Sequence, residues 1–309
     1  MFGIKPTDRR VPTTGMIPEV PGMPKSIRQM MTVGPLARSI EDLQLCFSLI
    51  AGADPQQPDI PPVPLDTPKV ETRNFASLQN LRIAWTDELS KFPVAREIKS
   101  GLVSVAKKLV DVGMQIENWV PEFDFVAACQ IYFAVATYNM VYSQQIRFDD
   151  IRKQLPFLFR EATQGDRTLR NQINTAKTGL SIWLKPSLKG YFEALTQRDR
   201  LIAQMDKELE QWDVWLCPVA ITPAFTHRAK GEAVEVDDRK IPYLLASGAY
   251  TIPFSLTGHP VVVIPIGQTQ TGLPIGMQFV GKRWRQMELL ATARQLTEIV
   301  GNYQRPPGY

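Results

Sequence analysis

The segment from Leu81 to Val120 constrains the fold of this 309-residue chain most strongly, because strand and helix patterns alternate within it. Residues 81–86 and 114–120 have the short apolar pattern of strands. Between them, a helix predicted to begin at Pro93 and end at Gly113 has its apolar residues on one face: Val94, Ile98, Leu102, Val105, Leu109 and Val112. Two strands joined by a helix are typical of a parallel crossover, so the sequence predicts an α/β fold.

The remaining elements are predicted from turn residues and apolar spacing. Residues 1–38 indicate loops with short strands, and Ser39 is placed to cap a helix that ends at Gly52. Further along, the predictions are mostly helix over 123–212, a buried strand over 213–218, a polar loop over 222–240, one helix over 243–256, an antiparallel hairpin formed by 260–266 and 275–280, and a last helix that ends at Gly301.

A proline-rich stretch interrupts this pattern. Residues 54–68 contain six prolines, which disfavour helix and sheet. We expect a linker or an extended crossing of the surface there.

Charge and hydropathy exclude two classes of partner. The net charge is only +4, and the densest basic cluster, residues 282–285, is interpreted as a solvated helix start rather than a nucleic-acid patch. The longest apolar run, Phe125 to Tyr138, is too short to span a bilayer and indicates a buried helix. Residues 1–30 lack the apolar core of a signal peptide, so we expect a cytoplasmic protein with no nucleic-acid or membrane partner.

The three cysteines, Cys46, Cys129 and Cys217, have apolar neighbours and no Cys-x-x-Cys spacing. They indicate buried free thiols in a reducing compartment. A cysteine nucleophile would need His227 or His259 as its base, which is the less favoured interpretation.

Familiar catalytic and metal motifs are absent from the sequence, including the P-loop, His-Glu-x-x-His, Gly-x-Ser-x-Gly and Gly-x-Gly-x-x-Gly. His259 is interpreted as a turn residue, and His227 as a solvated loop residue. The acidic pairs Asp149-Asp150 and Asp237-Asp238 indicate solvated charge. The residues alone assign no catalytic, cofactor-binding or metal-binding position, and we expect no cofactor.

Motifs at both ends of the chain resemble the amidase signature family. The matching residues are Phe2-Gly-Ile-Lys-Pro-Thr7, Arg10-Val-Pro12, Gly34-Pro-Leu-Ala-Arg-Ser39, Tyr191, Ala194, Arg198, 213–218, Thr257-Gly-His-Pro260 and Gly272 to Gln278. The segment from about 53 to 185 is only generically similar.

This resemblance implies hydrolysis of small carboxamides through an acyl-enzyme. The family uses a neutral lysine, a bridging serine held by a cis peptide and a nucleophilic serine, with backbone N–H groups that stabilise the oxyanion. All three side chains precede the Phe-Gly-Ile-Lys-Pro-Thr motif in the family, so none is assigned to a residue of this sequence. Lys5 matches the downstream motif instead, and Ser26 beside Lys25 has no glycine loop before it.

The resemblance also implies a fold. We expect residues 1–309 to be the C-terminal portion of a single domain, with a mixed sheet covered by helices on both faces and incomplete at its N-terminal side. Residues 125–142 and 243–254 are candidates for the wall of the substrate pocket, although core packing would explain each side chain equally well.

Three alternatives stay open. Met1 could be an internal valine of a longer gene, read from a GTG codon. The chain could instead be a short non-catalytic protein that binds a partner or itself, because a sheet cut through its middle exposes edges. The A subunit of a tRNA-dependent amidotransferase, which belongs to the same family, is the third alternative.

Overall fold

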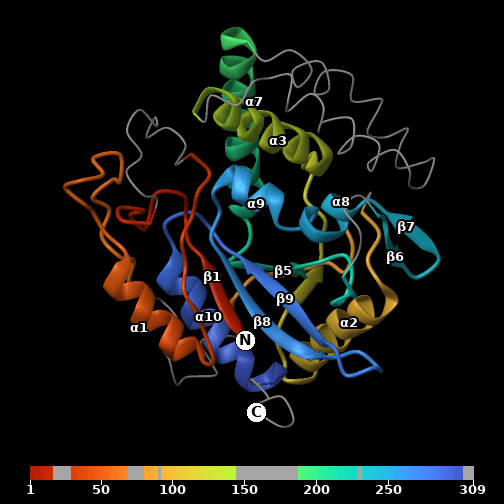
Figure 1. Ribbon diagram of the computed structural model, residues 1–309. Coiled ribbons are helices and arrows are strands. Elements are labelled where there is room, and N and C mark those ends of the chain that lie inside the picture. The colour runs from red at the N-terminus through yellow and green to blue at the C-terminus, as the bar shows by residue number, and fades with distance from the viewer. Residues whose placement is uncertain (17–28, 69–79, 90–91, 144–186, 228–231, 302–309) are drawn as a thin grey trace.

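A mixed sheet forms the centre of the molecule (Figure 1). The computed structural model describes residues 1–16, 29–68, 80–89, 92–143, 187–227 and 232–301. Seven strands run in the order β2 (Leu36–Ala37), β1 (Phe2–Lys5), β8 (Val261–Gln268), β9 (Pro274–Val280), β5 (Val214–Pro218), β3 (Ile83–Trp85) and β4 (Ile116–Asn118). Pairing is antiparallel from β2 to β5 and parallel among β5, β3 and β4, which confirms the expected mixed sheet.

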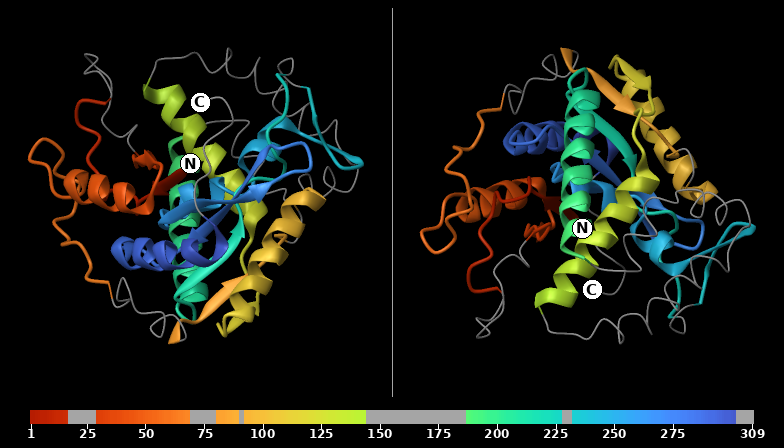
Figure 2. Two further views of the ribbon diagram at one scale, coloured as in Figure 1. Left: turned by 90° about the horizontal axis from the view of Figure 1, so that it is seen from below. Right: turned by 90° about the horizontal axis from the view of Figure 1, so that it is seen from above.

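Helices cover both faces of the sheet (Figure 2). One face carries α1 (Ile40–Ile50), α2 (Arg96–Asp111) and α10 (Gln286–Val300). The other carries α3 (Phe125–Ser143), α7 (Leu188–Leu209) and α9 (Ile252–Thr257). All residues of the interior strand β5 are buried, as expected for a strand covered on both sides. The predicted α/β fold is confirmed.

The strand–helix–strand unit has the predicted order and shorter elements. β3 pairs with β4 in parallel, and α2 connects them. The helix begins at Arg96 rather than Pro93. Four residues of its predicted apolar stripe are buried, namely Ile98, Leu102, Val105 and Leu109, whereas Val112 at the C-cap is exposed.

The beginning of the chain forms a strand that depends on a glycine. Gly34 lies against β1, and a Cβ atom built at this position would be 1.8 Å from the carbonyl oxygen of Ile4. No side chain fits there, so glycine is required for this close approach to β1. The predicted short strands of residues 1–38 are β1 and β2.

The proline-rich stretch follows α1 in the chain and contacts the start of α10. Residues 54–68 contain no helix and no strand beyond one isolated bridge. Near its end, the carboxylate of Asp66 accepts hydrogen bonds from the backbone of Met287 at 3.0 Å and Glu288 at 2.9 Å. A carboxylate in this position stabilises the N-terminus of α10. The choice between a linker and an extended crossing stays a prediction.

Two predictions over 222–256 are wrong in detail. The polar loop contains a hairpin of β6 (Val234–Val236) and β7 (Arg239–Ile241), in which Val234 and Val236 are buried. The predicted helix over 243–256 is divided into α8 (Tyr243–Gly248) and α9. Pro253 lies in the first turn of α9, where its missing N–H costs nothing, whereas a continuous helix would place it inside.

The apolar run that begins at Phe125 forms α3, and many of its side chains are buried, including Phe125, Cys129, Val135 and Tyr138. Within the described ranges, no helix combines the length and the apolar character needed to cross a membrane.

Candidate functional site

The carboxyl ends of the parallel strands meet at one edge of the sheet. The segments that follow β3, β4 and β5 begin there, and α3 starts directly after the segment that follows β4. Ligands of open α/β sheets bind at this edge.

The segment after β3 is held in one conformation by a buried tyrosine. The hydroxyl of Tyr250 accepts a hydrogen bond from the backbone N–H of Leu89 at 2.7 Å and donates one to the carbonyl of Phe92 at 3.0 Å. Burial raises the pKa of Tyr250, so the hydroxyl keeps its proton. The carbonyl of Tyr250 accepts a hydrogen bond from Gln278 Nε2 at 2.8 Å. This tyrosine positions the loop and leaves no hydroxyl proton for catalysis.

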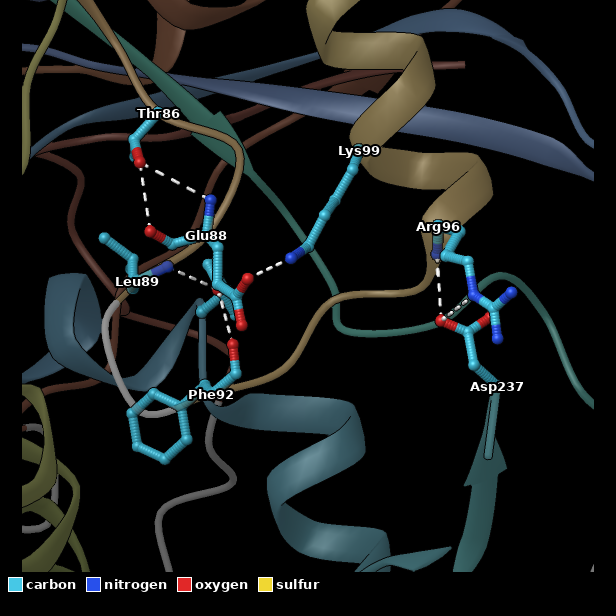
Figure 3. Close-up of polar contacts among 8 residues, drawn as sticks. Thr86, Glu88, Leu89, Phe92, Arg96, Lys99 and Asp237 are labelled. Atoms are coloured by element: carbon cyan, nitrogen blue, oxygen red, sulfur yellow. Dashed lines mark hydrogen bonds and ion pairs between the residues drawn. The ribbon is translucent and has the colours of Figure 1, made fainter. Parts of the chain in front are cut away.

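Two ion pairs fasten the same region from outside (Figure 3). Lys99 of α2 pairs with Glu88 in the segment after β3. Arg96, at the start of α2, pairs with Asp237, with 3.6 Å between Arg96 Nε and Asp237 Oδ2, and also donates its backbone N–H to that carboxylate at 3.1 Å. Asp237 and Asp238 form the exposed turn between β6 and β7, which agrees with the predicted solvated charge.

A cavity of about 290 Å³ lies beside this loop. It is lined by Phe92, residues 122–126 and Gln204. Two of its polar groups have structural roles: Asp124 accepts the backbone N–H of Ala127 at 2.9 Å, and Gln204 Nε2 donates to the carbonyl of Glu122. The cavity therefore combines aromatic walls with the carboxylates of Glu122 and Asp124.

A larger and more open groove of about 380 Å³ lies on the outer side of α3. Three α3 residues, Tyr132, Ala136 and Asn139, face the segment 29–32 across it. Part of the predicted pocket wall, residues 125–142, thus lines cavities on two sides of α3, while its inner face packs in the core. The second predicted wall, residues 243–254, contributes Tyr250 to the loop described above and Phe254 to the core.

The Lys-Pro-Thr motif enters a buried ionic cluster at the end of β1. Arg198 of α7 donates to Asp8 at 2.7 Å and to the carbonyl of Leu256 at 2.8 Å. Lys5 donates to the carbonyl of Pro6 at 2.9 Å, and burial lowers the pKa of Lys5 to about 7. An amine with this pKa has the property of a general base. Because the Lys5 amine donates to the carbonyl of Pro6, its side chain also stabilises the local conformation of the Lys-Pro-Thr motif.

His259 has a larger role than that of a turn residue. It follows Gly258, which has a left-handed conformation, and it is fully buried, with Nε2 3.1 Å from Asp206 Oδ1 and Nδ1 3.0 Å from Thr257 Oγ1. Arg283 also donates to Asp206, at 2.9 Å. Burial lowers the pKa of His259. Threonine, histidine and aspartate occur here in the order of a nucleophile triad, but Thr257 and His259 are inaccessible to a substrate.

The cysteine prediction is correct for two of the three thiols. Cys129 and Cys217 are buried, and burial raises the pKa of Cys129 to about 12 and that of Cys217 further. Cys46 is exposed, because it lies on the outer side of α1. No group of three or more His, Cys, Asp or Glu side chains that could hold a metal ion occurs in the described part of the chain.

The remaining residues singled out from the sequence fall into two groups, those that the structure describes and those that lie outside the described ranges. The basic cluster 282–285 does precede a helix, but Arg283 is tied to Asp206 rather than solvated. His227 is exposed, as predicted. Lys25, Ser26, Asp149 and Asp150 lie outside the described residues.

Sequence reasoning missed the polar residues of segment 29–32 and the pairing of Asp206 with His259. No local pattern marks either one, since each depends on contacts between elements far apart in the chain. One sequence signal leads to segment 29–32. Tyr191 matches the family motif, and its hydroxyl donates to Gln29 at 2.9 Å.

Comparisons with known proteins agree on a family. The family model described as Amidase matches residues 1–290. The A subunit of glutamyl-tRNA(Gln) amidotransferase from Macrococcus caseolyticus is 28% identical over 326 residues, and that from Halalkalibacterium halodurans is 27% identical over 325 residues. Each match covers 99% of this chain and 61% of the relative, so the chain spans about three-fifths of the length of these curated relatives.

Solved structures share the fold. The A subunit of the glutamyl-tRNA(Gln) amidotransferase from Thermotoga maritima superposes with a TM-score of 0.67 at 18% identity, covering 98% of this chain and 59% of that one. 6-Aminohexanoate cyclic dimer hydrolase, complexed with substrate, gives a TM-score of 0.66 at 18% identity, covering 99% and 62%. A bacterial aryl acylamidase of the amidase signature family gives 0.63 at 20% identity, covering 96% and 58%. At these identities the likeness establishes the fold alone.

Proposed function

This chain belongs to the amidase family, and we propose that it serves an enzyme that hydrolyses the carbon–nitrogen bond of small carboxamides. The observation that carries the proposal is the open groove of about 380 Å³ beside α3, in a chain whose residues 1–290 match the family model. Its size suits a small molecule, and its described lining is apolar with a few amide and hydroxyl groups. We place the enzyme in the cytoplasm.

Hydrolysis through an acyl-enzyme needs an activated nucleophile and an oxyanion site. The family places these parts in a Gly/Ser-rich region, and no Gly-Gly pair occurs in this sequence. We therefore propose that residues 1–309 provide the C-terminal part of one amidase domain, including strands and pocket walls. On this proposal, the nucleophile comes from polypeptide that the sequence does not contain, and the chain is inactive alone.

The experiment begins with the DNA upstream of codon 1. A Gly/Ser-rich amidase loop encoded there, in any frame, would allow a longer form to be expressed beside the 309-residue chain. Ammonia release from a panel of neutral carboxamides is expected from the longer form and not from the chain alone. Ammonia release by the purified chain would contradict the proposed inactivity, and an inactive longer form would contradict the amidase proposal.

A second candidate function is that of the A subunit of a tRNA-dependent amidotransferase, because the two relatives described above have that name. It requires an acyl-tRNA substrate and a partner protein. Transamidation of glutamyl-tRNA, together with co-purification of a second protein, would favour it over the small-molecule amidase. The third candidate is a non-catalytic protein that binds the missing part or a second copy of itself. It would form a stable complex and show neither ammonia release nor transamidation.

A further inference from the structure

The cavity of about 290 Å³ lies where three segments of the chain meet. Phe92 comes from the loop after β3, residues 122–126 follow β4 and include the start of α3, and Gln204 belongs to α7. The first two segments follow the carboxyl ends of parallel strands, the edge at which open α/β sheets bind ligands. The volume is close to the lower limit of about 300 Å³ for ligand pockets, so the cavity suits a small molecule.

Three phenylalanine rings form the apolar wall of this cavity. Phe92, Phe123 and Phe125 line it, and each is at most 9% exposed. The rings of Phe123 and Phe125 meet edge to face, with 4.9 Å between their centroids and 67° between their planes. Figure 3 shows the Phe92 ring on the side of its loop away from Lys99. Aromatic faces carry partial negative charge, which attracts cations.

Two carboxylates line the same cavity. Glu122 and Asp124 stand on either side of Phe123 in the chain, and both residues are exposed. Asp124 also accepts the backbone N–H of Ala127 at 2.9 Å, through Oδ1. A third carboxylate lies close by, since Glu208 Oε2 is 3.0 Å from the backbone nitrogen of Glu122. The cavity therefore places negative charge beside aromatic rings.

Contacts behind the wall hold these groups in place. The peptide groups of Glu122 are bound to α7 on both sides, because its N–H donates to Glu208 and its carbonyl accepts from Gln204. The Phe125 ring packs against Trp215 with 6.3 Å between centroids. The Phe92 ring packs edge-on against a buried tyrosine of α8–α9, with 6.5 Å between centroids. Walls that are fixed before a ligand enters lower the entropic cost of binding it.

This combination favours one class of ligand over three others. The carboxylates of Glu122 and Asp124 repel an anion. A metal ion needs several oxygen or nitrogen ligands, which phenylalanine rings do not supply. An uncharged apolar molecule would pack on the rings and gain nothing from the carboxylates. A cation whose charge is surrounded by methyl or methylene groups gains from both, because its apolar surface packs on the rings while its charge is attracted to the ring faces and to the carboxylates.

We propose that this cavity binds a small organic cation of the alkylated ammonium class. The alkyl groups around the nitrogen pack against Phe92, Phe123 and Phe125, and the carboxylates of Glu122 and Asp124 balance its charge. The inference goes beyond the proposed function and does not depend on it, since no step of the argument involves hydrolysis.

The probes are choline and 3,3-dimethylbutan-1-ol, which have the same shape and differ by a charged nitrogen in place of a carbon. Their binding to the purified 309-residue chain is measured by isothermal titration calorimetry at neutral pH in phosphate buffer, with NaCl at an ionic strength of about 0.15 M so that sodium competes for any unspecific acidic surface. We expect choline to bind about tenfold more tightly than the alcohol. Equal or tighter binding of the alcohol, or no choline binding by the folded chain, would overturn the proposal.

Variants with matched controls locate the binding. Glu122→Gln and Asp124→Asn each remove one charge, and asparagine still caps the start of α3; Glu235→Gln makes the same change at an exposed position of β6. We expect each cavity change to weaken choline binding about threefold and to leave binding of the alcohol unaltered. Phe123→Leu keeps an apolar wall without a ring face and should weaken choline binding about fivefold. Phe192→Leu, at a ring of α7 that is 59% exposed, is its control and should have no effect.

Two results would refute this site. Choline binding that survives both Glu122→Gln and Phe123→Leu would place the cation elsewhere. Choline binding that falls as much in the two control variants as in the cavity variants would show an unspecific effect of surface charge or stability. Near-ultraviolet circular dichroism verifies that each variant is folded, and the exposed position of Glu122 makes its variant the one least able to disturb the core.

Discussion

We expect Arg198→Met to lower the free energy of unfolding more than any of the other single substitutions predicted below. The guanidinium is 8% exposed and donates to Asp8, whose side chain is 12% exposed, at 2.7 Å. It also donates to the carbonyl of Leu256 at 2.8 Å. Methionine has a similar length but no donor, so a buried carboxylate and a carbonyl would both lose their partner.

The expected loss follows from the fate of that carboxylate. Removing one partner of a buried ion pair costs about 3–5 kcal/mol, because the other charge stays buried without compensation. Lys5 reduces the loss. Burial lowers the pKa of Lys5, and Arg198 lowers it further by repulsion, so the pKa of Lys5 rises when Arg198 is removed. A charged Lys5 then offsets part of the charge of Asp8, and we expect a loss of about 3 kcal/mol.

Urea unfolding at pH 7.5, followed by tryptophan fluorescence, measures the change. Arg200→Met is the control, since Arg200 is exposed two residues further along α7, and a change within about 0.5 kcal/mol is expected for it. Adding Asp8→Asn to Arg198→Met should recover about 2 kcal/mol, because the uncompensated charge is gone. A loss below about 1 kcal/mol, or a double variant no more stable than the single one, would refute this account.

The pH dependence provides an independent check of the same cluster. The folded-state pKa of Lys5, about 7, lies below its value of 10.5 in the unfolded chain. The unfolded chain therefore binds more protons between these values, and the free energy of unfolding should rise with pH across that window. In Arg198→Met the rise should begin at higher pH, since the folded-state pKa of Lys5 is raised. An unchanged onset would show that Arg198 does not act on Lys5.

Three further predictions concern packing, acid stability and thiol reactivity. Gly190→Ala should lower the free energy of unfolding in urea by about 1–3 kcal/mol, because the added Cβ would lie 2.3 Å from a tyrosine hydroxyl of α3. Gly101→Ala in α2, where the nearest contact is 3.4 Å, should raise it by about 0.5–1 kcal/mol. Equal effects of the two substitutions would contradict this geometry. Burial raises the pKa of Asp206, but hydrogen bonds from its histidine and arginine partners outweigh burial and hold it at about 2, so its stabilisation is present above about pH 4 and is lost as the pH falls toward 2. Asp206→Asn should cost about 1 kcal/mol at pH 7 and flatten that acid loss, measured by urea unfolding between pH 2 and 7. Cys46 should be the one thiol that reacts rapidly with Ellman's reagent in the native chain, and the other two should react only after unfolding.

The best predicted parts of the fold are those with a strong local pattern. The apolar stripe of α2 follows helical spacing over sixteen residues, and the strands on either side are short apolar runs. Ser39 caps α1 as expected, with its hydroxyl accepting the N–H of Asp42 at 3.1 Å. In these segments the local preference and the tertiary packing favour the same structure.

The wrong predictions lie where tertiary contacts outweigh local composition. The hairpin of β6 and β7 appears polar in sequence, and its two buried valines become visible as core residues only in the folded chain. The apolar neighbours of Cys46 predict a buried thiol, yet α1 packs through Leu43 and Phe47, which turns Cys46 outward. Apolar neighbours along a helix do not share a face.

The sequence alone determined the α/β class, the mixed sheet, the family and the absence of a Gly/Ser-rich loop, since each depends on local patterns or on motifs read in order. The tertiary structure decided which side chains meet. It joined His259 to Asp206, buried Lys5 beside Arg198, and placed Gln29 opposite α3 with Tyr191 behind it. These contacts connect residues more than fifty positions apart in most cases, and no spacing along the chain encodes such a distance, because it is set by how the helices pack on the sheet.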